Sequence, residues 1–222
     1  MAFIVAIDGP AGTGKGTITK LISQELGLVN IDTGATYRCV TLYTIKNNIN
    51  PDDRERIIRE LDNINIDMIN DNGDQKVFLN GEDVSKQIRN EEVSLRASKI
   101  SCIKEVRARM VEVQRNLAKG KDVIMEGRDI TTVVFPNADV KIYMDADENE
   151  RAKRRFLELQ VKGDIVTYDE VLNNIRTRDK NDKEKEVGAL KIAEDAIYVD
   201  TTDLSIEEVK EKIKEIIENK RK

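Results

Sequence analysis

A glycine-rich segment near the amino terminus carries the clearest chemical signal in this sequence. It runs without interruption as Gly9-Pro10-Ala11-Gly12-Thr13-Gly14-Lys15-Gly16-Thr17. Glycines let a backbone curl around a phosphate without Cβ clashes, and the N–H groups of such a loop point toward the anion. The lysine adds a mobile positive charge for the β- and γ-phosphates of a nucleotide. The segment therefore predicts a loop that binds the phosphates of ATP, and argues against a plain glycine-rich turn.

One position of this loop departs from the general P-loop pattern. In that pattern a serine or threonine follows the lysine directly and its hydroxyl binds magnesium, whereas Gly16 here separates Lys15 from Thr17. We therefore expect Mg²⁺ to be held mainly by the ATP phosphates and water, as is usual for this ion.

Arginines supply the second signal, and two short motifs indicate which of them matter. The motifs are Asp32-Thr33-Gly34-Ala35-Thr36-Tyr37-Arg38 and Glu126-Gly127-Arg128-Asp129, and each follows directly on an apolar segment. Ligands of open α/β sheets bind at the carboxyl ends of the strands, so both motifs should face the phosphate loop. Burying Arg128 and Asp129 there without a ligand would be costly, which favours a functional role.

The absence of histidine narrows the chemistry. Imidazole is excluded both as a general base and as a metal ligand. A phosphate monoester needs no base, because its second pKa of about 6 leaves it ionised at neutral pH. It needs charge neutralisation and alignment, which arginines around a phosphate loop provide. A sugar or nucleoside hydroxyl would call for a positioned carboxylate. We therefore predict phosphoryl transfer from ATP to a nucleoside monophosphate.

Composition limits the partners. The 222 residues are 39% hydrophobic and 36% charged, and the net charge of −5 argues against a general nucleic-acid or anionic-membrane binder. Cys39 and Cys102 lack CxxC spacing and fit a reducing cytosol. No apolar run approaches the roughly 18 residues of a membrane span. The apolar start, Phe3 to Ile7, lacks the basic region of a signal peptide. We expect a cytoplasmic protein with small-molecule partners.

The elements that must position these residues follow from the apolar pattern. Helical spacing over Gly16 to Leu26, over Glu92 to Leu117 and after the Ser205–Glu208 capping box alternates with short apolar runs. The alternation predicts a doubly wound, five-stranded parallel sheet of the P-loop NTPase type. Its strands are expected at Phe3 to Ile7, Leu28 to Ile31, Val123 to Met125, Val140 to Met144, and Ala196 to Val199.

Two regions interrupt this alternation. Ile64 to Asn70 and Lys76 to Leu79 are separated by the turn Asp71-Asn72-Gly73-Asp74, which predicts a small hairpin outside the parallel sheet. Residues 151 to 185 are helical by composition and rich in charge.

Taken together, the motifs resemble those of the bacterial cytidylate kinases, which phosphorylate CMP and dCMP, and the likeness covers essentially the whole chain. It rests on the glycine loop, the Asp32-to-Arg38 motif, the hairpin, Ala97-Ser98, Val106-Arg107, Glu126-Gly127-Arg128-Asp129, Val133-Val134-Phe135-Pro136, and Arg178-Asp179 followed by Asp182. The resemblance implies a core of residues 1–32, 101–150 and 186–222. It also implies a monophosphate-binding insert at 33–100 and a lid at 151–185. We expect a monomer.

The resemblance also implies roles for individual residues. Lys15, Arg128 and Arg178 are the expected catalytic residues. The expected ATP site comprises the loop from Gly9 to Thr17 with Arg151, Arg154 and Arg155. Arg38 and Arg128 are expected to bind the acceptor phosphate, and Ser98, Arg107 and Asp129 to read cytosine. The whole expected CMP site is Thr33, Tyr37, Arg38, Ser98, Arg107, Arg128, Asp129, Arg178, Asp182 and Lys185.

Departures and alternatives remain. Thr131 stands where that family usually has glycine, Lys185 stands where a second arginine is expected, and Val187-Gly188-Ala189-Leu190 replaces a turn that usually contains proline. Asp129 has an alternative role, which is to pair with a neighbouring arginine and hold its loop. The alternative functions are a kinase for UMP, AMP or deoxynucleoside monophosphates, and a nucleotide-dependent switch or RNA-associated P-loop protein.

Overall fold

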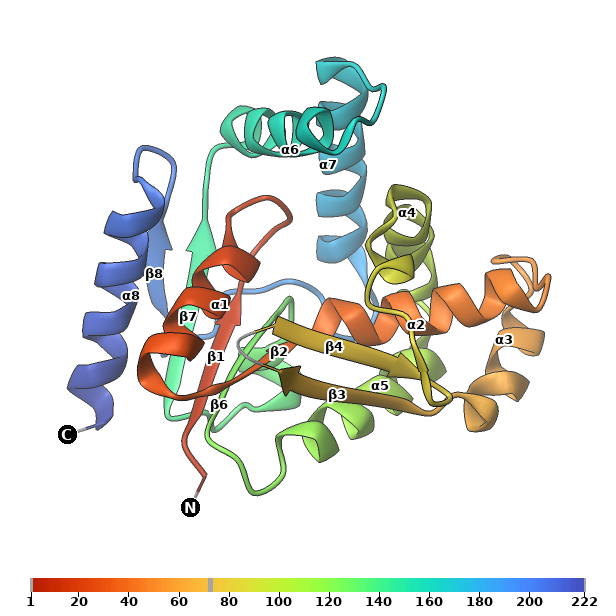
Figure 1. Ribbon diagram of the computed structural model, residues 1–222, viewed down its shortest axis with the longest axis horizontal. Helices are drawn as coiled ribbons and strands as arrows, with labels where there is room; N and C mark the ends of the chain where they lie inside the picture. The colour runs from red at the N-terminus through yellow and green to blue at the C-terminus, as the bar shows by residue number, and fades with distance from the viewer. Residues whose placement is uncertain (1, 72–73, 222) are drawn as a thin grey trace.

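A five-stranded parallel sheet forms the centre of the computed structural model, which describes residues 2–71 and 74–221 (Figure 1). Its strand order is β2-β6-β1-β7-β8, and every neighbouring pair is parallel. The predicted doubly wound sheet and its five strands are confirmed. Their bounds are β1 Ile4–Asp8, β2 Val29–Asp32, β6 Val123–Gly127, β7 Val140–Asp145 and β8 Ile197–Asp200.

Helices cover both faces of the sheet, because the strands are apolar on both sides. On one face, α1 (Lys15–Leu26) and α8 (Ile206–Arg221) bury Ile18, Ile22 and Ile213 against β1 and β7. On the other face, α5 (Lys104–Ala118) and the π-helical turn η3 (Ile130–Val134) pack on β6. Burying both faces in this way is typical of parallel sheets.

The periodic stretch predicted as helical from Glu92 to Leu117 consists of two helices. The first, α4 (Glu91–Ile100), ends at Ser101, and α5 begins after Ile103, whose backbone is extended. Ser101 donates its hydroxyl to the carbonyl of Ser98 at 2.8 Å, a local bond that competes with helix continuation. The break lets α4 pack against α2 (Thr33–Lys46) while α5 stays on the sheet.

The predicted hairpin lies outside the parallel sheet, as expected. It consists of β3 (Ile66–Asp71) and β4 (Asp74–Leu79), and a short third strand, β5 (Glu82–Asp83), pairs with β4. Residues 72 and 73 of the predicted turn lie outside the described residues. The hairpin shares one apolar core with α2, α4 and α5, and this region is completed by α3 (Arg54–Glu60), η1 (Leu61–Asn63) and η2 (Gln87–Arg89).

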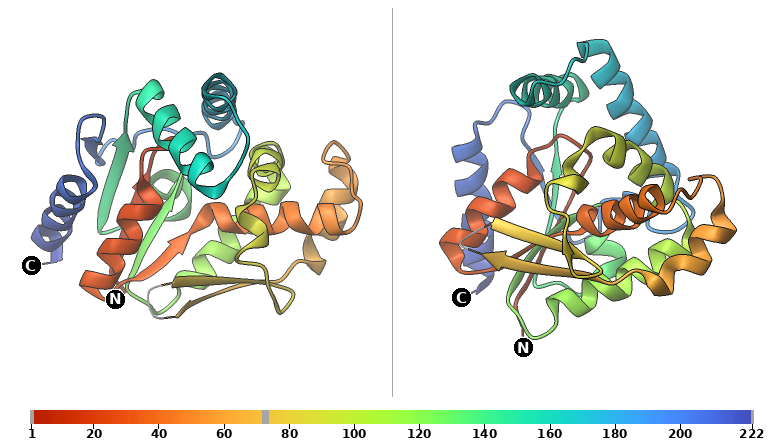
Figure 2. Two further views of the ribbon diagram at one scale, coloured as in Figure 1. Left: turned by 45° about the horizontal axis from the view of Figure 1, so that its top comes forward. Right: turned by 45° about the vertical axis from the view of Figure 1, so that its right-hand side comes forward.

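The charged stretch after β7 folds as two helices, α6 (Glu148–Lys162) and α7 (Tyr168–Glu184). They bury their own small apolar cluster of Ala152, Leu159, Val171 and Ile175. A capping box in which Thr167 and Glu170 bond reciprocally starts α7. The right-hand view of Figure 2 shows α7 leading from α6 toward α4, and α7 contacts both helices. In Figure 1 this helix pair lies above the edge of the sheet at which the loop between β1 and α1 emerges.

Candidate active site

A cleft of about 1040 Å³ opens at the carboxyl ends of β1, β2 and β6. Its lining comes from the phosphate loop, the start of α2, the end of α4, the segment after β6, and α6 and α7. Every residue predicted for the CMP site lies on this lining, although these residues are spread from position 33 to position 185. Of the predicted ATP site, the residues that line the cleft are Ala11, Gly12, Gly14, Lys15, Gly16, Thr17 and Arg155.

The phosphate loop joins β1 to α1 in the predicted register. Gly9 has φ 151°, and a Cβ there would lie 1.9 Å from the carbonyl oxygen of Met144 in β7, so only glycine lets the loop leave the sheet at this point. Lys15 is the first residue of α1, and its Nζ donates to the carbonyl of Pro10 at 2.6 Å and to the hydroxyl of Thr13 at 3.1 Å. The ammonium group therefore lies folded over its own loop.

Lys15 belongs to a set of buried charges that shift one another's pKa values. Burial and the nearby Arg128 guanidinium lower the pKa of Lys15 to about 7, against the opposing effect of Glu126. Burial and the charge of Asp32 raise the pKa of Glu126 to about 7. Perturbed groups of opposite type in one cleft are typical of a functional site.

Arg128, Asp182 and Lys185 form a second charged network across the cleft. The Nε of Arg128 donates to Oδ2 of Asp182 at 2.7 Å, and the Nζ of Lys185 donates to Oδ1 of the same carboxylate at 2.7 Å. Burial alone would raise the pKa of Asp182, but Arg128 and Lys185 outweigh it and hold this pKa well below its ordinary value. The network links the segment after β6 to the end of α7.

Arg178 of α7 also lines the cleft, among side chains of both charges. Burial and the positive charge of Arg128 lower the pKa of Arg178 to about 10, despite the attraction of Asp182. The guanidinium groups of Arg128 and Arg178 are thus close enough to repel each other, and both line the cleft together with Lys15. Such a site is stabilised by an anion with several negative charges.

Arg107 and Asp129 form a buried ion pair between α5 and the segment after β6, with side chains 3% and 5% exposed. Nη1 of Arg107 donates to the carbonyl of Ser101 at 3.2 Å, and its guanidinium lies 5.5 Å from the ring centre of Tyr37. Its Nε is buried without a hydrogen-bond acceptor among the described residues. This pairing is the contact expected from the alternative role of Asp129, in which it binds a neighbouring arginine and holds its own loop.

The start of α2 brings Thr33 and Arg38 to the cleft. Asp32 caps this helix by accepting the N–H of Ala35 at 3.3 Å, and its other oxygen binds Nη2 of Arg38 at 2.5 Å. The hydroxyl of Thr33 donates to the carbonyl of Glu126 at 2.7 Å, which fixes the two sequence motifs side by side. Both motifs therefore face the phosphate loop.

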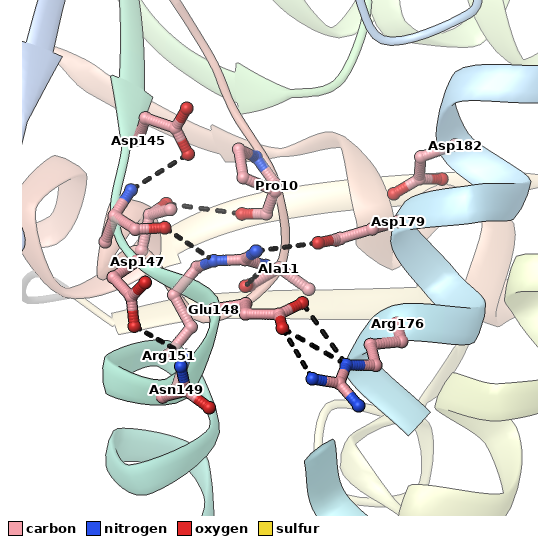
Figure 3. A network of polar contacts seen from close by, with 12 residues as sticks. Pro10, Ala11, Asp145, Asp147, Glu148, Asn149, Arg151, Arg176, Asp179 and Asp182 are labelled. Carbon is pink, nitrogen blue, oxygen red and sulfur yellow. Dashed lines mark hydrogen bonds and ion pairs between the residues drawn. The ribbon is translucent and has the colours of Figure 1, made fainter. Parts of the chain in front are cut away.

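The three arginines predicted to bind ATP from the lid occupy different places. Arg155 lines the cleft and pairs with Glu91 of α4. Arg151 lies between the loop and α7, where it donates to the carbonyl of Ala11 at 3.1 Å and pairs with Asp179 at 2.7 Å (Figure 3). Arg154 donates to the carbonyls of Thr201 and Thr202 at 2.7 and 3.0 Å. The ATP role of all three arginines stays a prediction.

Asp8 supports the site from behind the cleft lining, and the motifs do not single it out. It ends β1, is fully buried, and accepts the N–H groups of Ile130 and Thr131 at 2.9 and 2.8 Å and the hydroxyl of Thr131 at 2.6 Å. Burial raises its pKa to about 6, although the bonds from Thr131 oppose the rise. Its carboxylate thereby fixes the segment after β6 relative to the phosphate loop. In the sequence, the feature that could have indicated Asp8 is its place as a single carboxylate at the end of an otherwise apolar strand.

A glycine loop between the first strand and helix of a parallel sheet, with its lysine in a cleft rich in arginine, defines a P-loop protein that handles nucleotide phosphates. A family model described as cytidylate kinase matches residues 5–219. The chain belongs to this family.

Relatives and one solved structure agree with this placement. A protein of Caldicellulosiruptor bescii named cytidylate kinase is 54% identical, with 96% of this chain and 94% of that protein covered. The cytidylate kinase of Lactobacillus johnsonii is 47% identical over 98% of this chain and 95% of its own length. An uncharacterised protein from Eubacterium ventriosum, 12% identical, superposes with a TM-score of 0.51 over 97% of this chain and 98% of that one, which shows the fold alone.

Across the described ranges 2–71 and 74–221, the helices are all too short or too polar to traverse a bilayer.

Proposed function

We propose that this protein transfers the γ-phosphoryl group of ATP to CMP, giving ADP and CDP, and that dCMP serves as a second acceptor. The observation that carries the proposal is that Lys15, Arg128 and Arg178 line one cleft, in which burial and Arg128 lower the pKa of Arg178 to about 10. Two phosphate groups placed between these cations would remove their repulsion. Family membership supports the identity of the acceptor.

The reaction needs no proton acceptor on the protein. An ionised oxygen of the CMP phosphate forms a bond to the γ-phosphorus while the bond between that phosphorus and the β,γ-bridging oxygen breaks, and ADP leaves with the bond's electron pair. Lys15 and Arg178 neutralise the charge spread over the transferring group. Arg38 and Arg128 hold the acceptor phosphate in line, since planar guanidinium groups match its oxygens.

The base would be recognised by the Arg107–Asp129 pair together with Ser98. Cytosine offers an amino donor to a carboxylate and ring acceptors to a guanidinium. Arg107 lines the cleft, and its buried Nε lacks an acceptor among the described residues, so the ion pair leaves one donor of the guanidinium unused. Ser98 lines the cleft, and its Oγ accepts from Asn181 of α7 at 3.3 Å, so a base at this position would contact both the insert and the lid.

We propose Mg²⁺ as the ion that accompanies ATP, held mainly by the ATP phosphates and water. Two carboxylates, Asp32 and Glu126, line the cleft with Lys15 and would offer oxygen ligands to such an ion. Burial, followed by the charge of Asp32, raises the pKa of Glu126 although the neighbouring cations oppose the rise. Mg²⁺ commonly keeps several waters and contacts one or two carboxylates. When bound, it supplies charge neutralisation to the phosphates.

The division into a core, a monophosphate-binding insert at 33–100 and a lid at 151–185 is part of the proposal. The separate apolar cluster of α6 and α7 supports the lid as a unit. The insert packs its apolar cluster around α2 and the hairpin, and this cluster also includes residues of α5 from the core. Lid closure would exclude water and so favour transfer over hydrolysis. We further propose that the protein acts as a monomer in the cytoplasm.

The test is ADP release from ATP in the presence of AMP, CMP, dCMP, UMP or GMP. The proposal predicts turnover that requires an added monophosphate and is fastest with CMP. Best turnover with UMP or AMP would assign the chain to a kinase of another monophosphate. ATP turnover that is indifferent to all five acceptors would favour a nucleotide-dependent switch.

A further inference from the structure

Gly188 lies where the chain returns from the lid to the sheet. The segment 185–190 is anchored at both ends to Asp182, through the Lys185 ion pair at 2.7 Å and through the N–H of Leu190, which donates to the Asp182 carbonyl at 2.7 Å. Between these anchors Gly188 adopts φ 68°, in the left-handed region that residues with a Cβ enter at a cost. The position of the segment is therefore set by contacts at both ends.

The backbone of Gly188 packs directly on the Arg107–Asp129 pair. A Cβ at this position would lie 2.1 Å from Nη2 of Arg107 and 2.3 Å from Oδ2 of Asp129. These two atoms are hydrogen-bonded to each other, and both side chains are almost fully buried. Arg107 is also held by the Ser101 carbonyl on another side. Neither atom is the free end of a mobile side chain, so a Cβ would have to displace the pair or lift the segment.

We propose that Gly188 is a positioning residue for acceptor recognition. Its bare backbone closes one side of the Arg107–Asp129 pair and so fixes the direction in which the carboxylate and guanidinium face the cleft. The same segment carries Lys185, which binds the partner of Arg128, so the position of the lid and the orientation of the base-reading pair are coupled at this glycine. The inference rests on the proposed function, because it assigns Gly188 to the acceptor side of that site.

A matched control separates this role from backbone strain. Gly163, which follows α6, has φ 83°, but a Cβ there would meet no atom within 4 Å. Gly163→Ala therefore introduces left-handed strain alone, whereas Gly188→Ala introduces strain and the collision. Gly188→Asn is the second variant, since asparagine tolerates the left-handed region better than alanine while still carrying a Cβ.

The experiment is steady-state kinetics of the full chain with CMP, UMP and ATP varied, after circular dichroism has shown that each variant is folded. We expect both Gly188 variants to raise the KM for CMP about tenfold or more, because displacing a positioning contact by about 1 Å can cost up to a hundredfold. The KM for ATP should stay within about twofold, and the preference for CMP over UMP should narrow. Gly163→Ala should leave all three values within about twofold.

The outcomes distinguish the two claims. Failure of the unchanged chain to phosphorylate CMP overturns the proposed function and, with it, this inference. CMP phosphorylation by the unchanged chain with a KM for CMP unaffected in Gly188→Asn overturns only the positioning role. Equal rises for ATP and CMP, or a rise matched by Gly163→Ala, assign Gly188 a merely structural part and also overturn it. A Gly188 variant that does not fold is replaced in the comparison by the other one, and loss of fold in both overturns the inference.

Discussion

Asp129 accepts a hydrogen bond from Nη2 of Arg107 at a point where both side chains are almost completely buried. A buried carboxylate is costly without such a partner, so the pair holds the segment after β6 against α5. The pairing leaves one donor of the Arg107 guanidinium unused, because its Nε lacks an acceptor among the described residues. The structural role and the proposed base-reading role of Asp129 are therefore compatible, and a substitution can separate them.

Asp129→Asn is expected to narrow the preference for CMP over UMP. A carboxylate can only accept from the amino group of cytosine, whereas facing O4 of uracil it leaves two buried acceptors together, at a cost of about 1–3 kcal/mol or about ten- to a hundredfold in efficiency. An amide can donate as well as accept. The measurement is kcat/KM for both acceptors with both proteins, and a CMP/UMP ratio unchanged by the substitution would leave Asp129 with its structural role alone.

Arg38→Ala and Arg128→Ala should raise the KM for CMP much more than the KM for ATP. Each guanidinium lines the cleft and is proposed to bind the acceptor phosphate. Losing a hydrogen bond to a charged group costs about 1.5–3 kcal/mol, or about ten- to a hundredfold. Arg56→Ala on α3 is the control, because that arginine is exposed and does not line the cleft. Initial rates over a range of each substrate concentration give both KM values. An increase confined to the KM for ATP would refute the proposed binding of the acceptor phosphate by these arginines.

ATP binding should take up protons near pH 8, and Lys15→Arg should take up fewer. The free Lys15 has a pKa of about 7 because of burial and Arg128, so it is mostly neutral at that pH. Triphosphate oxygens favour the charged form and raise the pKa, which draws a proton from solvent. The arginine of Lys15→Arg is charged both with and without ATP, so it takes up no proton when ATP binds. Calorimetry in buffers of different ionisation enthalpy gives the proton count, and equal uptake by both proteins would contradict the shifted lysine.

Thr131→Val should destabilise the fold by about 1–3 kcal/mol at pH 8, because it removes a hydroxyl donor from the buried Asp8 carboxylate. The control is Thr132→Val, since the Thr132 hydroxyl is buried without a partner among the described residues. Thr132→Val should leave the free energy of unfolding unchanged or raise it, because it removes a buried hydroxyl that has no hydrogen bond to lose.

The loss caused by Thr131→Val should shrink at pH 5. Burial raises the pKa of Asp8 from 3.8 to about 6, so the folded state binds this proton more tightly than the unfolded state. The contribution of Asp8 to stability is therefore fully present below pH 3.8 and falls as the pH rises to about 6. The Thr131 hydroxyl stabilises chiefly the charged form, which is the minor form at pH 5. Urea denaturation at both pH values checks this, and a loss that is larger at pH 5 would contradict it.

The sequence predicts the sheet and the composition of the cleft well, because both depend on local patterns. Apolar runs mark the five strands, and motifs at strand ends place Arg38 and Arg128 at one edge. The break between α4 and α5 escapes periodicity analysis, since the apolar spacing continues through Ser101. The partners of Arg151 and Asp8 escape as well. The bonds from Arg151 to the Ala11 carbonyl and from the Thr131 N–H to Asp8 join residues more than 100 positions apart, so only the folded chain shows them. The ion pair of Arg151 with Asp179 joins two different helices.

The most direct test of the account follows the phosphoryl group itself. Incubation of the full chain with γ-labelled ATP and CMP, followed by separation of the nucleotides, should place the label in CDP. Little label should appear as inorganic phosphate, and omission of CMP should leave the ATP intact. Label released as inorganic phosphate at the same rate with and without CMP would contradict phosphoryl transfer to a monophosphate as the function of this cleft.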